Sequence, residues 1–308
     1  MIGIKNIGSY IPEKRISNFE DQSRFDINKE FLEKKIGVHS VARKQTFELT
    51  SDLCISAFKD LLLREQNLEL SQIDFVCVCT QNGDYQLPHT SAVVTAKLGC
   101  SLNCAAFDIS LGCSGYVYSL LVAKSFMETN NMKLGLVFTS DPYSLILDPN
   151  DKSTSLLFGD AATVTLLNSC PVFTVGQASF DTDGNRYDDL IKHKNQALQM
   201  NGRGIFDFAM KHVPENVRKC LKKNELEQDN VDAYILHQAS KYVIDNLVRR
   251  MKLNPCKVPF AIQQYGNTIS STIPLLLKDY VYDDKKTVIL LCGFGVGLSV
   301  ASLIIRRL

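Results

Sequence analysis

One cysteine of this chain stands where a reactive thiol could form. Cys113 lies between an apolar, β-forming run (105–110) and a helical pattern that begins at Gly115. A thiol at the start of a helix is close to unpaired backbone N–H groups and to the positive end of the helix dipole, and both favour the thiolate. We therefore expect Cys113 to have a lowered pKa and to act as a covalent catalyst, with a buried packing cysteine as the alternative.

Two more polar residues follow apolar runs later in the chain. His237 comes directly after Tyr234-Ile235-Leu236, and Asn267 comes after Gly266. Taken singly, each has an ordinary structural explanation, namely a core histidine that bonds a backbone carbonyl and an asparagine that caps a turn. The combination of Cys, His and Asn in this order favours a functional site.

The composition is that of an ordinary globular chain of 308 residues, with 45% apolar and 22% charged residues. Thirty-four basic and thirty-three acidic residues leave a formal net charge of +1, so nothing global attracts the chain to nucleic acid or to an anionic membrane. The first ten residues lack the basic segment and apolar run of a secretory signal, and we expect a cytoplasmic protein.

The ten cysteines are best explained as reduced thiols, several of them in buried strands. Because the sequence has no CxxC pair and no Cys/His cluster at ligand spacing, we expect no metal site. The uncharged stretch 287–305 is long enough to span a membrane, but its glycines, serines and β-branched residues favour two buried strands joined by a glycine turn.

Apolar, β-rich runs alternate with amphipathic helical patterns, which is typical of an α/β protein with a mostly parallel core sheet. The expected strands are Phe75–Thr80, Ala105–Ser110, Gly135–Thr139, Ala162–Leu167, Ala233–His237, Val288–Cys292 and Leu298–Ile304. The expected helices include Ser51–Leu63, Thr90–Leu98, Gly115–Met127, Phe206–Lys222, Lys241–Met251 and Ser271–Tyr280.

Internal repetition predicts two similar halves. The strands 136–140 and 289–293 each precede a Phe-Gly turn, at Phe158 and Phe294, and then a further strand. Functional residues at corresponding places in such halves would meet at the interface between them. Ser169-Cys170-Pro171 interrupts the pattern, so we expect an N-terminal half with the nucleophilic cysteine over 1–168 and a C-terminal half with the histidine and asparagine over 169–308.

The motifs together resemble one family along nearly the full length of the chain. They are the opening Ile4–Glu13, the early loop Lys35–Val38, Cys113-Ser114-Gly115, Phe158–Ala162, His237-Gln238-Ala239 and Gly266-Asn267-Thr268. In this order and spacing they resemble 3-oxoacyl-(acyl carrier protein) synthase III, a condensing enzyme of the thiolase superfamily. The resemblance implies a thiolase-like fold of two α/β halves in five layers (αβαβα), a homodimer, and no cofactor beyond a coenzyme A thioester as substrate.

The resemblance also implies a mechanism. Cys113 would accept the acyl group of an acyl-coenzyme A. Neutral His237, as an Nε2–H donor, and the amide of Asn267 would bind the thioester oxygen of a malonyl group and stabilise the enolate left by loss of CO2. The expected carrier of the malonyl group is acyl carrier protein, with coenzyme A as the alternative. The backbone N–H groups of Cys113 and Val296 would form the oxyanion hole.

Substrate contacts depart from the family pattern. Phe31 and Lys35 stand where relatives carry the Trp and Arg that contact the coenzyme A adenine, and Ser240 replaces an Asn near the pantetheine. Leu87 stands in the loop that reaches across the family's dimer, and Phe294 completes the expected substrate contacts.

The docking positions for carrier protein also differ. Asp207 and Tyr242 stand where relatives place a Lys and an Arg. Because carrier protein is acidic, its docking would then depend on other basic residues, for which the candidates are Lys211, Lys241, Arg249 and Arg250.

Two alternatives to the condensing enzyme follow. One is a Cys-dependent acyltransferase of the same fold that delivers the acyl group to a hydroxyl or amine of a small molecule, which the altered docking residues favour. The other is a non-catalytic partner subunit of a heterodimer, against which the intact triad of residue types argues. The acyl chain length and the pathway do not follow from the sequence.

Overall fold

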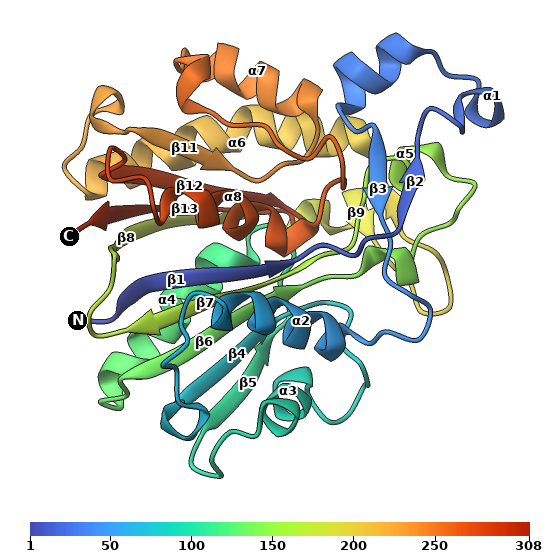
Figure 1. Cartoon of the computed structure of the whole chain (residues 1–308). Helices are drawn as coiled ribbons and strands as arrows, with labels where there is room; N and C mark the ends of the chain where they lie inside the picture. Colours follow the sequence, from blue (N-terminus) through green and yellow to red (C-terminus); the bar gives the residue numbers. More distant parts are fainter.

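The computed structural model describes residues 1–308, and its centre is a nine-stranded sheet (Figure 1). The strand order is β11-β12-β13-β8-β1-β7-β6-β4-β5. The two sets of strands meet where β1 pairs with β8 through only two residue pairs, Gly3 with Thr174 and Ile4 with Phe173. The sheet therefore consists of a four-stranded C-terminal part and a five-stranded N-terminal part.

The strands of this sheet are β1 (Gly3–Tyr10), β4 (Phe75–Cys79), β5 (Ala105–Ile109), β6 (Leu134–Ser140), β7 (Ala162–Asn168), β8 (Phe173–Thr182), β11 (Ala233–Leu236), β12 (Val288–Gly295) and β13 (Ser299–Arg307). The main α-helices are α2 (Thr50–Leu62), α3 (Thr90–Leu98), α4 (Gly115–Thr129), α6 (Gly202–Lys223), α7 (Lys241–Met251) and α8 (Thr272–Tyr280). Shorter pieces include β2 (Arg15–Ser17), β3 (Ser40–Ala42), α1 (Gln22–Phe25), η1 (Phe31–Ile36) and α5 (Lys152–Ser155).

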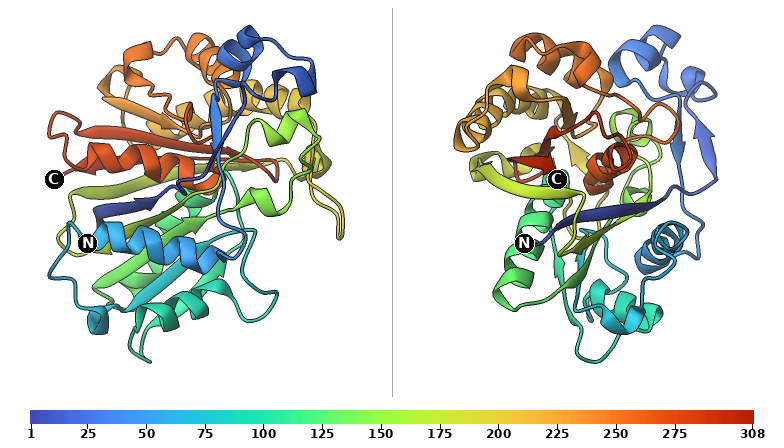
Figure 2. Two further views of the ribbon diagram at one scale, coloured as in Figure 1. Left: turned by 45° about the vertical axis from the view of Figure 1, so that its right-hand side comes forward. Right: turned by 60° about the vertical axis from the view of Figure 1, so that its left-hand side comes forward.

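Three apolar clusters define five layers. In β12, Ile289 and Leu291 point into a central cluster with α4 and α8, whereas Leu290 and Cys292 point to an outer cluster with α6 and α7. A third cluster packs α2 and α3 against the other outer face. Because both faces of both parts of the sheet are buried, strands such as β4 and β12 are apolar throughout rather than alternating. The resulting order is helix, sheet, helix, sheet, helix (Figures 1 and 2), as expected.

All seven strands and all six helices predicted from the pattern are present, with ends shifted by a few residues. The strand β8 was not among them, since its sequence FTVGQASFDT mixes apolar, polar and glycine residues. The uncharged stretch forms the antiparallel pair β12 and β13, in register from Val288 with Arg306 to Gly295 with Ser299. No helix in the structure has both the length and the apolar character needed to cross a membrane.

The parallel strands determine where the functional residues lie. β4, β5 and β6 run parallel in the N-terminal part, and β11 and β12 run parallel in the C-terminal part. The expectation of a mostly parallel sheet is wrong, because the central strands β1, β7, β8 and β13 pair antiparallel with their neighbours. Cys113 follows the carboxyl end of β5, and His237 follows that of β11. The small elements α1, β2, β3 and α5 gather beyond the strand ends, next to the start of α7 (Figure 1).

Candidate active site

Cys113 lies on the turn between β5 and α4 and is only 4% exposed. The end of β12 passes so close to it that only glycine fits. A Cβ at Gly293 would lie 2.5 Å from the carbonyl oxygen of Cys113, and one at Gly295 would lie 2.6 Å from its Sγ. The Phe-Gly turn of the C-terminal half therefore forms one wall around the thiol.

Burial determines the ionisation of this thiol. It raises the pKa of Cys113 to about 12, whereas backbone hydrogen bonds from Val296 and from Cys113 itself act in the opposite direction. The lowered pKa expected from the helix start is therefore wrong for the free chain, because desolvation outweighs the backbone donors. The same two backbone N–H groups are those expected to form the oxyanion hole.

His237 is fixed at the end of β11. Its backbone N–H donates to the carbonyl of Cys292 at 2.8 Å, its ring Nδ1 lies 2.7 Å from Oγ1 of Thr272, and Phe294 packs edge-on at 5.5 Å between ring centroids. Burial lowers the pKa of His237 to about 3. The imidazole is therefore neutral at pH 7, which suits a hydrogen-bond donor to a thioester oxygen rather than a charged acid.

Asn267 is held by the N-terminal half of the chain. Its backbone N–H donates to Leu157 at 2.8 Å, and its carbonyl accepts from Gly159 at 2.9 Å. Its Oδ1 accepts the backbone N–H of Ile269 at 2.9 Å, whereas Nδ2 has only a long contact of 3.4 Å to the carbonyl of Ala239. Because the amide oxygen is occupied, the N–H donors remain for a ligand.

Cys113, His237 and Asn267 come together in one largely apolar cavity of about 120 Å³. Two of the predicted substrate-binding residues, Ser240 and Phe294, line it as well. The other lining residues are Leu157, Phe158, Leu190, Met200, Gly202, Ile205, Ala239, Val243 and Gly295. The three catalytic candidates thus lie together, although 154 positions separate Cys113 from Asn267 (267 − 113).

A second hollow of about 570 Å³ adjoins this cavity and shares Leu157, Gly202, Ser240 and Val243 with it. The predicted residues Phe31 and Lys35 line this outer hollow and not the inner cavity. Its remaining lining residues are Ile36, Lys152, Ser153, Arg203, Phe206, Asp207 and Tyr242. We call this outer hollow the mouth.

Aromatic and basic side chains are layered at the mouth. Lys35 Nζ lies 3.9 Å from the ring centroid of Tyr242, which stacks on Phe206 at 5.2 Å. Lys152, Arg203 and Phe206 also line the mouth and were not predicted as site residues. Lys152 lies on the short helix α5 and Arg203 at the start of α6, and no local motif marks either one.

The predicted docking residues are dispersed. Arg249 lines a hollow beside the mouth together with Lys34, Lys35 and Lys152, whereas Lys241 is paired with Asp245 at 2.9 Å. Lys211 and Arg250 are exposed on α6 and α7 but line neither hollow. Leu87 is 86% exposed and contributes nothing to the cavity of this chain.

One buried acid was also missed. Asp141 follows β6, accepts the backbone N–H of Gln81 at 2.7 Å, and accepts the hydroxyl of Ser270. Burial raises its pKa to about 6. Because Ser270 comes three residues after Asn267, this carboxyl ties the asparagine segment to the N-terminal half.

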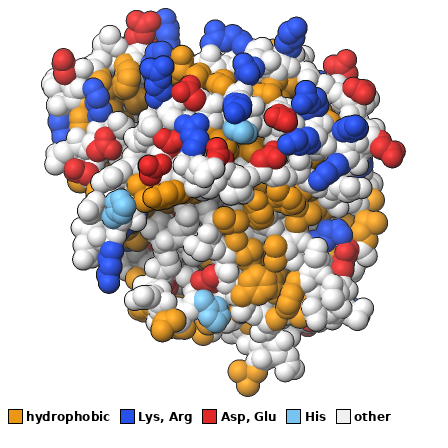
Figure 3. All heavy atoms as spheres, turned by 180° about the vertical axis from the view of Figure 1, so that it is seen from behind, with side chains coloured by type: hydrophobic (Ala, Val, Ile, Leu, Met, Phe, Trp, Pro, Cys, Tyr) orange, Lys and Arg blue, Asp and Glu red, His pale blue; other side chains and the backbone are white.

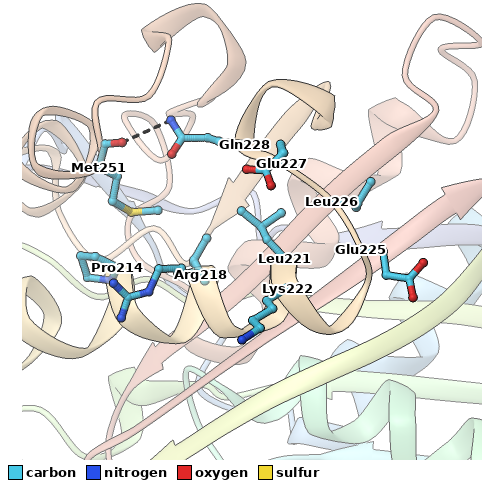
Figure 4. Close-up of a pocket in the computed structure, with 10 residues that line it drawn as sticks. Pro214, Arg218, Leu221, Lys222, Glu225, Leu226, Glu227, Gln228 and Met251 are labelled. Atoms are coloured by element: carbon cyan, nitrogen blue, oxygen red, sulfur yellow. Dashed lines mark hydrogen bonds between the residues drawn. The ribbon is translucent and has the colours of Figure 1, made fainter.

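A hollow of about 710 Å³ lies elsewhere, between the second half of α6, the end of α7 and the loop 225–228 (Figure 4). Arg218 and Lys222 face it together with Glu225 and Glu227, and Gln228 Nε2 donates to the carbonyl of Met251 at 3.2 Å. It has no cysteine, histidine or serine. This hollow therefore offers no nucleophile or histidine of the kind found in the Cys113 cavity. The chain also has no group of three or more Cys, His, Asp or Glu residues placed to hold a metal.

A buried cysteine, a neutral histidine and an asparagine amide in one cavity between two thiolase-like halves define a condensing enzyme. The family model described as "3-Oxoacyl-[acyl-carrier-protein (ACP)] synthase III" matches residues 107–184, and the model for the C-terminal part of the same family matches residues 221–307. The beta-ketoacyl-[acyl-carrier-protein] synthase III of Lactococcus lactis subsp. lactis is 33% identical over an alignment of 324 positions, which covers 98% of both chains. The chain therefore belongs to the 3-oxoacyl-[acyl-carrier-protein] synthase III family.

Other relatives agree with this assignment. The corresponding protein of Streptococcus mutans is 31% identical with 98% of both chains covered. The solved 3-oxoacyl-[acyl-carrier-protein] synthase III of Aquifex aeolicus is 28% identical, with a TM-score of 0.92 and complete coverage of both chains. A priming beta-ketosynthase of the R1128 polyketide pathway is 26% identical, with a TM-score of 0.90 and coverage of 100% of this chain and 96% of its own. The chain is thus an acyl-transferring condensing enzyme.

Proposed function

We propose that this enzyme takes an acyl group from an acyl-coenzyme A onto Cys113 and condenses it with malonyl-acyl carrier protein, with loss of CO2, to give a 3-oxoacyl thioester. The observation that carries the proposal is the cavity in which the thiol, a neutral imidazole and an amide with only one long N–H contact meet. A simple acyl transfer needs a thiol but no pair of neutral donors. The complete set therefore favours condensation.

In the first half-reaction, Sγ of Cys113 attacks the thioester carbon and the bond to the coenzyme A sulfur breaks. The thiol proton leaves with the coenzyme A thiolate, so the products are acyl-Cys113 and free coenzyme A. The oxyanion of the tetrahedral intermediate would lie near the backbone N–H groups of Cys113 and Val296, the groups that already bond the sulfur.

In the second half-reaction, His237 and Asn267 donate to the thioester oxygen of the malonyl group. The C–C bond to the carboxylate breaks and CO2 leaves. The electron pair of that bond forms an enolate, which the two donors stabilise. The enolate carbon then attacks acyl-Cys113, and the cysteine sulfur leaves and regains a proton. Neutral donors are appropriate because the apolar cavity disfavours a second charge.

The mouth supports a coenzyme A thioester as the donor. Lys35, Lys152 and Arg203 are cations at the entrance, which suits phosphate groups, and Phe31 and Tyr242 are aromatic faces for a base. For the carrier protein, we propose docking on the basic residues at this rim, with Arg249 beside the mouth. Of the four docking candidates, Lys241 is the least suited because Asp245 already pairs with it.

We propose a homodimer in the cytoplasm. Charged side chains gather over the half of the molecule that carries α6 and α7, whereas apolar and uncharged side chains occupy much of the other half (Figure 3). Exposed apolar residues include Leu87, Leu102, Val122, Leu145 and Phe180. The ten free cysteines suit a reducing compartment. Light scattering on the purified chain tests the dimer, and a monomer at micromolar concentration would contradict it.

The central test is mass spectrometry of the intact protein after incubation with acyl-coenzyme A of increasing chain length, followed by malonyl-acyl carrier protein. We expect an acyl adduct on the wild-type chain and on Cys256→Ala, an exposed control thiol, and none on Cys113→Ala. Addition of the malonyl substrate should discharge the adduct with release of CO2. Discharge only by small amines or hydroxyl compounds would favour the acyltransferase, and no adduct with any acyl group would favour the non-catalytic subunit.

A further inference from the structure

The ring of His237 has a partner on the side away from the substrate. Its Nδ1 lies 2.7 Å from Oγ1 of Thr272, the first residue of α8. Both side chains are buried, with 2% exposure for His237 and 1% for Thr272. Thr272 is not among the residues that line the cavity, and so it can act on the reaction only through the residues that it contacts.

The position of one proton decides what His237 can do. Since burial lowers the pKa of His237 to about 3, the ring is neutral and has a single N–H. With the proton on Nε2, the ring donates to the thioester oxygen. With the proton on Nδ1, Nε2 presents a lone pair to that oxygen, which repels the enolate instead of stabilising it. The tautomer therefore determines whether the site has two donors or one.

The competing acceptor for a proton on Nδ1 is the backbone of Ile269. A backbone hydrogen bond with Ile269 favours a proton on the ring, and because the Ile269 N–H is already given to Asn267, the group that remains is its carbonyl. Without another contact, this carbonyl would draw the proton to Nδ1.

The hydroxyl of Thr272 can reverse this preference. It has one hydrogen and two acceptors in reach, the carbonyl of Ile269 at 3.0 Å and Nδ1 of His237 at 2.7 Å. The carbonyl also accepts the backbone N–H of Thr272, so it keeps a donor when the hydroxyl turns to the ring. A hydroxyl directed at Nδ1 therefore leaves no buried group unpaired, and it forces the ring proton onto Nε2.

We propose that Thr272 is a positioning residue that donates to Nδ1 of His237 and thereby holds the Nε2–H tautomer directed into the cavity. The same short segment then orients both donors, because the N–H of Ile269 fixes the amide of Asn267 and the hydroxyl of Thr272 fixes the imidazole. The role in decarboxylation rests on the proposed function, whereas the tautomer itself does not.

The kinetic test compares Thr272→Val, which removes the hydroxyl and keeps the branched shape, with Thr272→Ser, which keeps the hydroxyl. We expect Thr272→Val to slow decarboxylation of a malonyl thioester by about tenfold to a hundredfold, which is less than for the complete loss of one oxyanion donor, with acylation of Cys113 by acyl-coenzyme A within about twofold of wild type. Thr272→Ser should restore decarboxylation. Thr165→Val is the matched control, since Thr165 is a buried threonine whose hydroxyl bonds Tyr116 instead.

The decisive readout is the tautomer, measured by 15N NMR on protein labelled at histidine, with the His237 signals assigned by their loss in His237→Gln. We expect the Nε2–H pattern in the wild type and in Thr272→Ser, and the Nδ1–H pattern in Thr272→Val. A wild-type ring with its proton on Nδ1 overturns the proposal even if Thr272→Val does not fold. Equal decarboxylation by Thr272→Val and the wild type, with unchanged His237 signals, also overturns it. If the wild type shows the Nε2–H pattern but decarboxylates no malonyl thioester, the proposed function fails and the tautomer assignment stands.

Discussion

At the scale of single residues, the site combines a protonated thiol with neutral hydrogen-bond donors. Burial raises the pKa of Cys113 to about 12 and lowers that of His237 to about 3. At pH 7 Cys113 is therefore almost entirely in the thiol form and His237 almost entirely neutral. The two half-reactions depend on these groups in different ways, so they should differ in their response to pH.

We expect acylation of Cys113 to become faster with pH. Below its pKa the thiolate fraction rises tenfold per pH unit, so the rate should rise by about tenfold per unit between pH 7 and 9. Decarboxylation should be flat over the same range, because His237 stays neutral above about pH 4. Stopped reactions analysed by mass spectrometry give both rates. A plateau of acylation below pH 8 would show that the helix start lowers the thiol pKa after all.

The donors His237 and Asn267 should separate the half-reactions. We expect His237→Ala and Asn267→Ala to accept an acyl group on Cys113 but to lose decarboxylation by about a hundredfold or more, because an enolate would lack one donor. Acyl adducts measured by mass spectrometry and CO2 release from a malonyl thioester test the two steps. Full condensation by Asn267→Ala would favour the acyltransferase alternative.

At the scale of elements, the loop after β12 and the turn before α4 fit each other by size. A Cβ on Gly112 would lie 2.6 Å from Cγ1 of Val296 and 2.6 Å from Oε1 of Gln81. The absence of a side chain at Gly112 therefore provides room for the side chain of Val296. The backbone N–H of Val296 then keeps its direction toward Cys113.

This fit predicts a compensating pair of substitutions. Gly112→Ala should displace Val296 and slow acylation of Cys113 by about tenfold to a hundredfold, since one backbone donor to the oxyanion moves. Adding Val296→Gly to Gly112→Ala should recover part of the rate, because the clash with Val296 is removed and a backbone N–H remains, whereas the close contact with Gln81 persists. The measurement is a double-mutant cycle, in which the rate of acyl-adduct formation is compared for the wild type, both single variants and the double variant. Additive effects of the two substitutions would contradict the contact between Gly112 and Val296.

At the scale of the whole molecule, the mouth lies where η1 and α5 of the N-terminal half meet α6 and α7 of the C-terminal half. Its basic residues therefore come from both halves. We expect Arg249→Glu to raise KM for malonyl-acyl carrier protein and to change KM for malonyl-coenzyme A little, with weaker binding at higher salt. Arg218→Glu is the control, since Arg218 lines the separate hollow at the far end of α6. An equal change of KM for both substrates, or salt-insensitive kinetics, would argue for a small-molecule acceptor.

The sequence by itself determined the strands and helices with strong periodicity. It also predicted the two similar halves and singled out Cys113, His237 and Asn267 as the catalytic candidates. Each of these three residues ends or follows a local motif. Such a motif consists of neighbouring residues, so it can be recognised in the sequence without knowledge of the tertiary structure. The strand β8 was missed because its residues do not alternate, and its place depends on pairing with β1 and β13.

Only the tertiary structure decided the properties that depend on burial and on contacts between distant segments. The pKa of Cys113 is raised because strand β12 and the surrounding apolar residues exclude water, which no motif around the cysteine encodes. Thr272 bonds His237 across 35 positions, and Lys152 and Arg203 reach the mouth from separate helices. Such contacts depend on how the two halves pack, and a one-dimensional pattern does not specify that packing.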